Sequence, residues 1–265
     1  MNHKADIGVF GGSGFYDLHD KFEEVKIETP YGPPSDLIAL AEIKGKKVAF
    51  LPRHGKKHTF PPHMINFRAN LWAMKELGVK KIISPFACGS LKHEIKLGQF
   101  VIVDQFFDRT RGRKDTFFDG PTAVHISCDD LYCPELRKIA QQAMTKVGVK
   151  TQLGGTAVVI QGPRFSTKAE SRWFSQMGWD VVTMTQYPEN VLARELEMCF
   201  VGIALVTDYD VGLVGDGGQP VSAELVGKTF QQNIHNIKKV VFDMVENIPL
   251  KSCRCQESLK FARLS

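Results

Sequence analysis

Two short apolar runs enclose a helix-like segment between residues 181 and 210, and this pattern constrains the fold more than any other stretch of the chain. The enclosed segment contains Pro188 and then places apolar residues at helical spacing, at Val191, Leu192 and Leu196. The pattern predicts a strand, a helix and a second strand, which we interpret as a βαβ unit. Polar residues follow each strand, Met184-Thr185 in the first case and 207–210 (Thr-Asp-Tyr-Asp) in the second. Because open α/β sheets bind ligands just outside the carboxyl ends of their strands, we expect a binding site there.

The composition favours one soluble α/β domain. The chain has 265 residues, 43% of them apolar, and neither a linker nor an internal repeat divides it. Its net charge of +5 is modest and dispersed, so nucleic-acid binding is not favoured. We interpret the densest basic stretch, 109–114, as a loop after a strand rather than as a phosphate-tracking surface.

We expect a cytoplasmic protein that does not enter a membrane. The N-terminus lacks the pattern of a signal peptide, and no apolar run approaches the roughly 18 residues of a membrane span. Four of the six cysteines are scattered among apolar neighbours and are interpreted as small buried hydrophobes: Cys88, Cys128, Cys133 and Cys199. Cys253-Arg-Cys255 alone is too little for a zinc site. It leaves open a tight disulfide or pairing with other cysteines.

Three turns are candidate anion sites. Gly11-Gly-Ser-Gly14 follows an apolar strand but matches neither the dinucleotide fingerprint nor the Walker pattern, so an ordinary turn and a phosphate cradle both remain open. Pro52-Arg53-His54-Gly55 is either a cationic phosphate corner or a surface turn with salt bridges. Residues 86–90 (Phe-Ala-Cys-Gly-Ser) follow a strand predicted to end at Ser84, and their backbone N–H groups are possible anion donors.

The remaining elements follow from periodicity. Further strands are predicted near 23–28, 37–43, 47–51, 100–106 and 156–160. Helices are predicted over 62–78, from Cys133 to about Val147 and from about Ser222, whereas the tail after Pro249 is predicted to be weakly structured. Taken alone, Phe165 is a core residue by default and His125 a structural histidine.

Six motifs occur together and in order, and as a set they resemble the trimeric purine nucleoside phosphorylases, most closely the methylthioadenosine phosphorylase branch. The motifs are 11–14 (GGSG), 52–55 (PRHG), 87–91 (ACGSL), 161–166 (QGPRFS), 184–189 (MTQYPE) and 207–210 (TDYD). The resemblance covers roughly residues 5–248 and leaves 249–265 as a tail. It implies a single α/β domain over residues 1–265, with a mixed, partly barrel-like central sheet flanked by helices. It also implies a homotrimer or a dimer of trimers, no cofactor, no metal, and inorganic phosphate as a co-substrate.

The resemblance also implies roles for individual residues. Met184 would lie against the ribose, Phe165 and Ser166 would line the base pocket, and His125 would reach the 5′ region of a neighbouring subunit's site. The phosphate site would comprise Ser13, Arg53, His54, Phe86, Ala87 and Thr185.

The implied reaction is phosphorolysis of 5′-methylthioadenosine to adenine and 5-methylthioribose 1-phosphate. Phosphate attacks C1′ while the purine departs, so charge develops on both partners. Asp210 would share or donate a proton at purine N7, and Asp208 would accept a hydrogen bond from the 6-amino group. Val226 stands where 6-oxopurine relatives carry a histidine, which is consistent with a methylthio group.

Two departures from the family pattern leave substrate alternatives open. Phe86 stands where the family often has threonine, and Gly212 where one subset has tryptophan. A 6-oxopurine or broad-specificity nucleoside phosphorylase is therefore the alternative function. A non-catalytic nucleotide-binding protein would have lost Arg53, His54 or Asp210, and a calcium site at 208–216 fails the EF-hand spacing.

Overall fold

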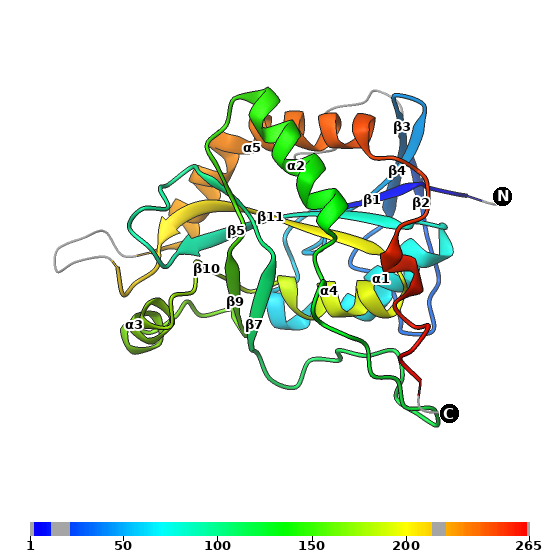
Figure 1. Ribbon diagram of the computed structural model, residues 1–265, viewed down its shortest axis with the longest axis horizontal. Helices are drawn as coiled ribbons and strands as arrows, with labels where there is room; N and C mark the ends of the chain where they lie inside the picture. The colour runs from blue at the N-terminus through cyan, green and yellow to red at the C-terminus, as the bar shows by residue number, and fades with distance from the viewer. Residues whose placement is uncertain (1–2, 12–21, 214–220, 264–265) are drawn as a thin grey trace.

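The computed structural model describes residues 3–11, 22–213 and 221–263 and shows one α/β domain built on a mixed sheet (Figure 1). The strands join in the order β2-β3-β4-β1-β5-β10-β9-β7, with β11, β6 and β8 branching from β5. Their bounds are β1 Ile7–Phe10, β2 Glu23–Val25, β3 Ile38–Ile43, β4 Lys46–Leu51, β5 Lys81–Ser90, β6 Phe100–Ile102, β7 Gln105–Arg109, β8 Thr151–Leu153, β9 Thr156–Ile160, β10 Val181–Thr183 and β11 Cys199–Tyr209.

Strand β5 is the centre of the sheet. It is apolar and buried along almost its whole length, as expected of a strand covered on both faces. Strand β11 runs parallel to it along one edge. The other edge is shared, because β1 pairs with Lys81–Ile83 in parallel and β10 pairs with Gly89-Ser90 in antiparallel orientation. The carboxyl ends of β1 and β10 therefore face each other along β5, and neither strand is in register with residues 84–88.

Helices cover both faces of the sheet (Figure 1). Helices α2 and α5 pack over one face around a core that includes Leu136, Ile203 and Val241. Helices α1 and α4 pack over the other face, and α3 packs beside β9 and β10. Their bounds are α1 Phe67–Glu76, α2 Pro134–Val147, α3 Lys168–Gln176, α4 Gln186–Glu195 and α5 Ala223–Asn247, with short 3-10 turns at Pro62–Met64 and Arg254–Glu257.

Local sequence signals account for the helix boundaries. Pro134 occupies the first turn of α2, which ends at Gly148 in the left-handed conformation. Ser222 caps α5 by accepting the Leu225 N–H. A capping box between Thr167 and Glu170 opens α3. The predicted helix starts near Cys133 and Ser222 are thus confirmed, whereas β8 and α3 were not predicted.

Three sequence expectations were wrong. The strand-helix-strand order of 181–209 is confirmed, but β10 is antiparallel to β5 and β11 is parallel to it, so the unit is not a parallel βαβ. Strand β5 does not end at Ser84 but continues to Ser90, because Phe86 and Cys88 are buried between packed layers. The tail after Pro249 is not loose, since Cys255 and Ala262 are buried and Arg263 forms a bridge with Val124. Across the described ranges, no helix is long and apolar enough to cross a membrane.

Candidate active site

A cavity of about 750 Å³ opens beside β5, where the ends of β1 and β10 face each other. Residues 85–89 of β5 form part of its wall, together with Gly11 after β1 and the turn after β4. The carboxyl end of β11 contributes Thr207, Asp208 and Asp210, and α5 contributes an apolar wall. The cavity expected at the strand ends therefore exists. Strands β1 and β10 approach it from opposite directions along β5, and their carboxyl ends leave part of the β5 edge unpaired between them.

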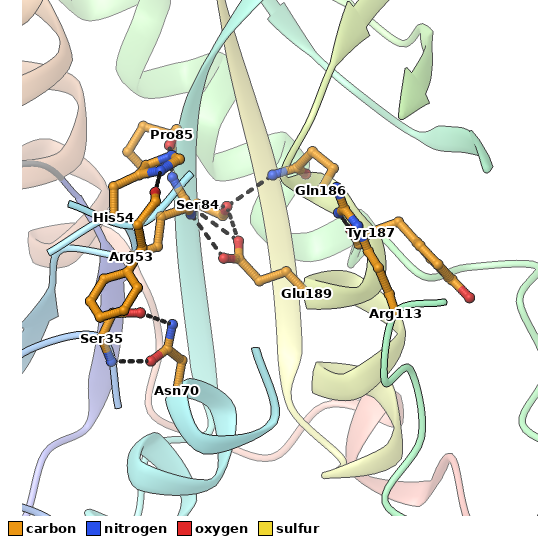
Figure 2. Close-up of polar contacts among 11 residues, drawn as sticks. Ser35, Arg53, His54, Asn70, Ser84, Pro85, Arg113, Gln186, Tyr187 and Glu189 are labelled. Carbon is orange, nitrogen blue, oxygen red and sulfur yellow. Dashed lines mark hydrogen bonds and ion pairs between the residues drawn. The ribbon is translucent and has the colours of Figure 1, made fainter. Parts of the chain in front are cut away.

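Arg53 is held at one side of the cavity by a buried network (Figure 2). Its Nε donates to Glu189 Oε1 at 2.9 Å and its Nη2 to Glu189 Oε2 at 3.0 Å. The same Nη2 donates to Ser84 Oγ at 2.8 Å, and Nη1 donates to the Pro85 carbonyl at 3.0 Å. Four of the five guanidinium N–H groups are thus used, and the charge is balanced by a fully buried carboxylate. Arg53 is fixed at the wall of the cavity, and one of its N–H groups bonds to no described residue.

The Ser84 hydroxyl joins this network to the start of α4. It donates to Glu189 Oε2 at 2.6 Å and accepts from Gln186 Nε2 at 3.0 Å (Figure 2). This network fixes Arg53, Ser84 and Glu189, because moving one of them leaves buried polar groups unpaired. Gln186 Oε1 is the one buried polar side-chain atom of these four residues that bonds to no described residue.

His54 is neutral and presents a hydrogen-bond acceptor. Its Nδ1 lies 2.8 Å from the Phe60 carbonyl oxygen, so Nδ1 carries the hydrogen and Nε2 carries the lone pair. Burial lowers the pKa of His54 to about 4, and the charges of Arg53 and the stacked His58 contribute to that shift. A neutral imidazole of this tautomer accepts a hydrogen bond from an O–H group.

The other residues predicted for the phosphate site lie around the same corner, with one exception. Phe86, Ala87 and Thr185 all line the cavity. Phe86 has no polar side-chain atom, so only its backbone could contact an anion. Thr185 stands at the N-cap of α4 without a side-chain cap bond. The remaining residue, Ser13, lies outside the described residues.

Asp208 lines the same cavity beside Gly89, whereas Arg53 contacts Ser84 and Pro85 farther back along β5. It is 5% exposed, and its Oδ2 accepts a hydrogen bond from the Thr207 hydroxyl at 2.8 Å. Burial raises the pKa of Asp208 to about 6, the Thr207 bond opposes this rise, and the charge of Asp210 adds to it. Gly89 makes room for the carboxylate, because a Cβ at that position would lie 2.9 Å from Asp208 Oδ1.

Asp210 is 2% exposed and lies beside Ser166, which is 7% exposed. Burial raises the pKa of Asp210, while the nearby Ser171 and Ser166 hydroxyls oppose the rise. Even so, Asp210 Oδ2 and Ser166 Oγ make no hydrogen bond of ordinary geometry with any described residue. Buried polar atoms without partners are rare, and in a cavity they are available to a ligand.

Less polar side chains also line the cavity, among them those of Met184 and Phe165. Gly162 permits this packing, since a Cβ there would lie 2.7 Å from Met184 Sδ. Val226, Phe230 and Ile234 of α5 form an apolar wall, of which the sequence reasoning had singled out only Val226.

The family model of the phosphorylase superfamily matches residues 6–246. The chain belongs to this superfamily. It is 48% identical to the S-methyl-5'-thioadenosine phosphorylase of Thermofilum pendens, covering 97% of both chains. It is 47% identical to the purine nucleoside phosphorylase of Streptomyces coelicolor, covering 97% of this chain and 95% of the relative.

Solved structures agree with this assignment. A methylthioadenosine phosphorylase from an antarctic soil metagenomic library superimposes with a TM-score of 0.92 at 39% identity, covering 100% of this chain and 93% of the other. The methylthioadenosine phosphorylase of Schistosoma mansoni, in complex with adenine, gives a TM-score of 0.91 at 32% identity over 98% and 99% of the two chains. The mixed, helix-flanked α/β fold expected from the motifs is that of this superfamily.

In this member of the phosphorylase superfamily, His125 does not line its own chain's cavity. It is exposed, and its backbone N–H donates to the Ala262 carbonyl at 2.8 Å. The C-terminal tail therefore fixes the loop that contains His125, and this loop lies outside the cavity of the same chain.

Several residues around the phosphorylase cavity were not predicted. Glu189 was part of a motif but had no role assigned, and its pairing with Arg53 depends on the packing of α4 against β5. Arg113, in the stretch interpreted as a simple loop, donates to the Gln161 carbonyl at 3.0 Å and to the Tyr187 carbonyl. Burial lowers the pKa of Arg113 to about 10. Its side chain thus links the 161–166 turn to α4, and Figure 2 shows the end of this link at Tyr187.

Gly212, one of the two departures from the family pattern, has a local explanation. A Cβ there would lie 2.6 Å from Ser171 Oγ and 3.0 Å from the Arg172 backbone nitrogen. Its N–H donates to Ser171 Oγ at 2.9 Å. The start of α3 fills the space that a larger side chain would need.

Proposed function

We propose that the chain acts as a single unit that catalyses phosphorolysis of 5′-methylthioadenosine to adenine and 5-methylthioribose 1-phosphate. One observation carries the proposal: two buried carboxyls, those of Asp208 and Asp210, line the same cavity as Arg53 and His54. The two carboxyls would assist the departure of the purine, and the arginine and histidine would bind the anionic nucleophile. The similarity to methylthioadenosine phosphorylases supports the same reaction.

Inorganic phosphate would bind beside Arg53, His54, Ala87 and Thr185. The remaining Arg53 N–H and the Thr185 hydroxyl would donate to phosphate oxygens. His54 Nε2 would accept the hydrogen of a monoprotonated phosphate, which helps to orient the other oxygens toward C1′. Because Glu189 neutralises the charge of Arg53, this corner would bind phosphate mainly through the positions of its hydrogen-bonding groups and less through net positive charge.

The purine would lie between Phe165 and the end of β11. A phosphate oxygen attacks C1′ while the C1′–N9 bond breaks, and the electron pair of that bond passes into the purine. Asp210, whose pKa is raised by burial, would give or share a proton at N7 and so stabilise the departing base. Asp208 in its ionised form accepts a hydrogen bond from the 6-amino group.

The sugar would pass Met184 and direct its 5′ group to the apolar wall of Val226, Phe230 and Ile234. A methylthio group loses no hydrogen bond on entering such a wall, whereas a 5′-hydroxyl does. His125 would complete the 5′ region of a neighbouring subunit, so we propose a homotrimer or a dimer of trimers. No cofactor takes part in the proposed chemistry.

Purine release from methylthioadenosine, adenosine, inosine and guanosine, each with and without phosphate, tests the proposal. We expect adenine release from methylthioadenosine to be fastest and to require phosphate. Preferential cleavage of inosine and guanosine would favour the 6-oxopurine alternative, to which an Asp208 with a pKa of about 6 lends some support. Release without phosphate, or none from any nucleoside, would refute the phosphorylase proposal.

A further inference from the structure

Four cysteines from three distant parts of the sequence meet beneath the start of α2. Cys133 is the N-cap of α2, Cys199 is the first residue of β11, and Cys253 and Cys255 belong to the C-terminal tail. Their four Sγ atoms all lie within 4.8 Å of one another. Cys133, Cys199 and Cys255 are buried and Cys253 is half-buried. The spacing in the sequence had argued against a zinc site because two cysteines are too few, but the fold supplies two more.

The sulfur separations match a metal tetrahedron. Sγ of Cys253 lies 3.8 Å from Sγ of Cys133 and 3.8 Å from Sγ of Cys255. A disulfide would require sulfur atoms about 2.05 Å apart. Four thiolates around Zn²⁺ at about 2.3 Å form a tetrahedron whose edges measure about 3.8 Å.

Backbone N–H groups favour the thiolate form at two of the four cysteines. Cys133 stands at the N-terminus of a 14-residue helix, where backbone N–H groups and the helix dipole stabilise negative charge. The Cys253 sulfur accepts the backbone N–H of Gln256.

Positive charge also lies close to the cluster. Lys81 is the register partner of Cys199 on the neighbouring strand, and its side chain is 2% exposed. Lys81 and Lys251 both approach Glu135, at 3.4 and 3.9 Å, in the first turn of α2. Two ammonium groups around one carboxylate leave a local excess of positive charge, which offsets part of the −2 charge of a zinc tetrathiolate.

We propose that Cys133, Cys199, Cys253 and Cys255 bind one Zn²⁺ as a structural site. All four coordination positions are filled by protein sulfur, so the ion has no open position for a substrate. Binding replaces the S–H bonds with S–Zn bonds and releases the thiol protons to solvent. The site is separate from the phosphorylase cavity, because none of the four cysteines lines that cavity.

The ion would fasten the C-terminal tail to the body of the domain. Beyond the cluster, the Ser258 hydroxyl donates to the Arg194 carbonyl at 2.7 Å. The tail then pairs with the 124–125 segment through the Val124–Arg263 bridge and the His125–Ala262 hydrogen bond. Loss of the ion should therefore loosen the loop that carries His125 while leaving the cavity intact.

Metal analysis of the full-length protein, purified without added chelator, tests the site directly. We expect about one zinc per chain in the wild type and in Cys128→Ser, whose exposed cysteine lies outside the cluster. We expect Cys255→Ser and Cys133→Ser to lose most of the zinc and to melt at lower temperature. A strong chelator should lower the Tm of the wild type to that of Cys255→Ser but should not change the Tm of Cys255→Ser itself.

Two further measurements keep the proposal falsifiable if a variant fails to fold. Replacement of zinc by Co²⁺ in the wild type should give the intense visible absorption of a tetrahedral cobalt tetrathiolate. Mass spectrometry after thiol alkylation without reduction should find the four cysteines free once zinc is removed. Two disulfides among them in the freshly purified protein, or free thiols that take up neither zinc nor cobalt, would overturn the proposal.

Discussion

The two sides of the cavity differ in how their polar groups are satisfied. At the phosphate corner, Arg53 is 5% exposed and four of its N–H groups are already bonded to Glu189, Ser84 and Pro85. At the proposed purine side, Asp210 Oδ2 and Ser166 Oγ are equally buried but bond to no described residue, and burial raises the pKa of both aspartates.

This difference indicates at which side of the cavity a ligand has to supply hydrogen bonds to buried polar groups. Protein contacts already fix the proposed phosphate corner, so phosphate binding would need little reorganisation there. At the proposed purine side, Asp210 Oδ2 and Ser166 Oγ bond to no described residue, and they would gain hydrogen bonds when a base is bound. Substitutions at the first side should act mainly on stability and phosphate binding, and substitutions at the second on turnover and base selectivity.

Asp210→Asn should have the largest effect on catalysis. The amide keeps the shape but cannot supply the proton at N7, so we expect kcat to fall at least about 100-fold on every nucleoside. Steady-state kinetics with methylthioadenosine and inosine measures this fall. Asp180→Asn is the matched control, because Asp180 is buried and paired with Lys92 outside the cavity. If Asp210→Asn altered only phosphate affinity, its assignment to the base would be wrong.

Glu189→Gln should chiefly lower stability. It leaves the Arg53 charge buried without a counter-ion, which costs about 3–5 kcal/mol in comparable cases. Phosphate can replace the lost negative charge, so we expect added phosphate to raise the Tm of this variant more than that of the wild type. Thermal melting with and without phosphate measures both effects.

Glu195→Gln separates this effect from the general cost of altering a buried glutamate. Glu195 lies on the same helix and is 4% exposed, but it accepts hydrogen bonds from Thr116 and Phe117 rather than from an arginine. Its variant should gain no extra protection from phosphate. Equal protection of both variants would show that phosphate does not bind beside Arg53.

Gly89→Ala should displace Asp208. The added Cβ would lie 2.9 Å from Asp208 Oδ1 and 3.2 Å from Val182 Cγ1. Overpacking of this kind costs about 1–3 kcal/mol, and we expect kcat/KM for methylthioadenosine to fall about 10-fold. Gly8→Ala is the control, since its Cβ would meet Ile82 and Met74 in the core. That variant should lose stability but retain its kcat/KM, and a similar loss of kcat/KM in both would remove Asp208 from the explanation.

Much of this site followed from the sequence. The resemblance of short motifs after β4, β9, β10 and β11 to a known family identified residues that line one cavity, and the local sequence pattern placed those motifs at strand ends. Strand direction could not be recognised in this way. The antiparallel orientation of β10 depends on how α3 and α4 turn the chain. A short apolar run such as Val181–Thr183 does not indicate in which direction the strand will run in the sheet.

Contacts between residues that are far apart in the chain could not be predicted from the sequence either. Nothing near Arg53 indicates Glu189, 136 residues away, and nothing near Cys253 indicates Cys133. Both pairs are created when α2 and α4 pack on the sheet. Likewise, the tail after Pro249 was predicted to be weakly structured, whereas burial of Cys255 and Ala262 orders it.

Base selectivity should change with pH through Asp208, with the smallest effect of the four predictions. With its pKa raised to about 6 from an ordinary value of 3.8, Asp208 is mostly ionised at pH 7.5 and mostly protonated at pH 5. An ionised carboxylate accepts more strongly from the 6-amino group of adenine, whereas a protonated one can donate to the oxygen of hypoxanthine.

We therefore expect the Kd of adenine to rise about fivefold from pH 7.5 to pH 5 and that of hypoxanthine to fall. Calorimetric titration of the phosphate-saturated protein at several pH values measures both constants. In Asp208→Asn the selectivity change near pH 6 should vanish, and hypoxanthine should bind better than in the wild type at pH 7.5, because the amide can donate at every pH. A selectivity change near pH 6 that persists in Asp208→Asn would assign the titration to another group and leave the purine side of the cavity without its proposed 6-amino acceptor.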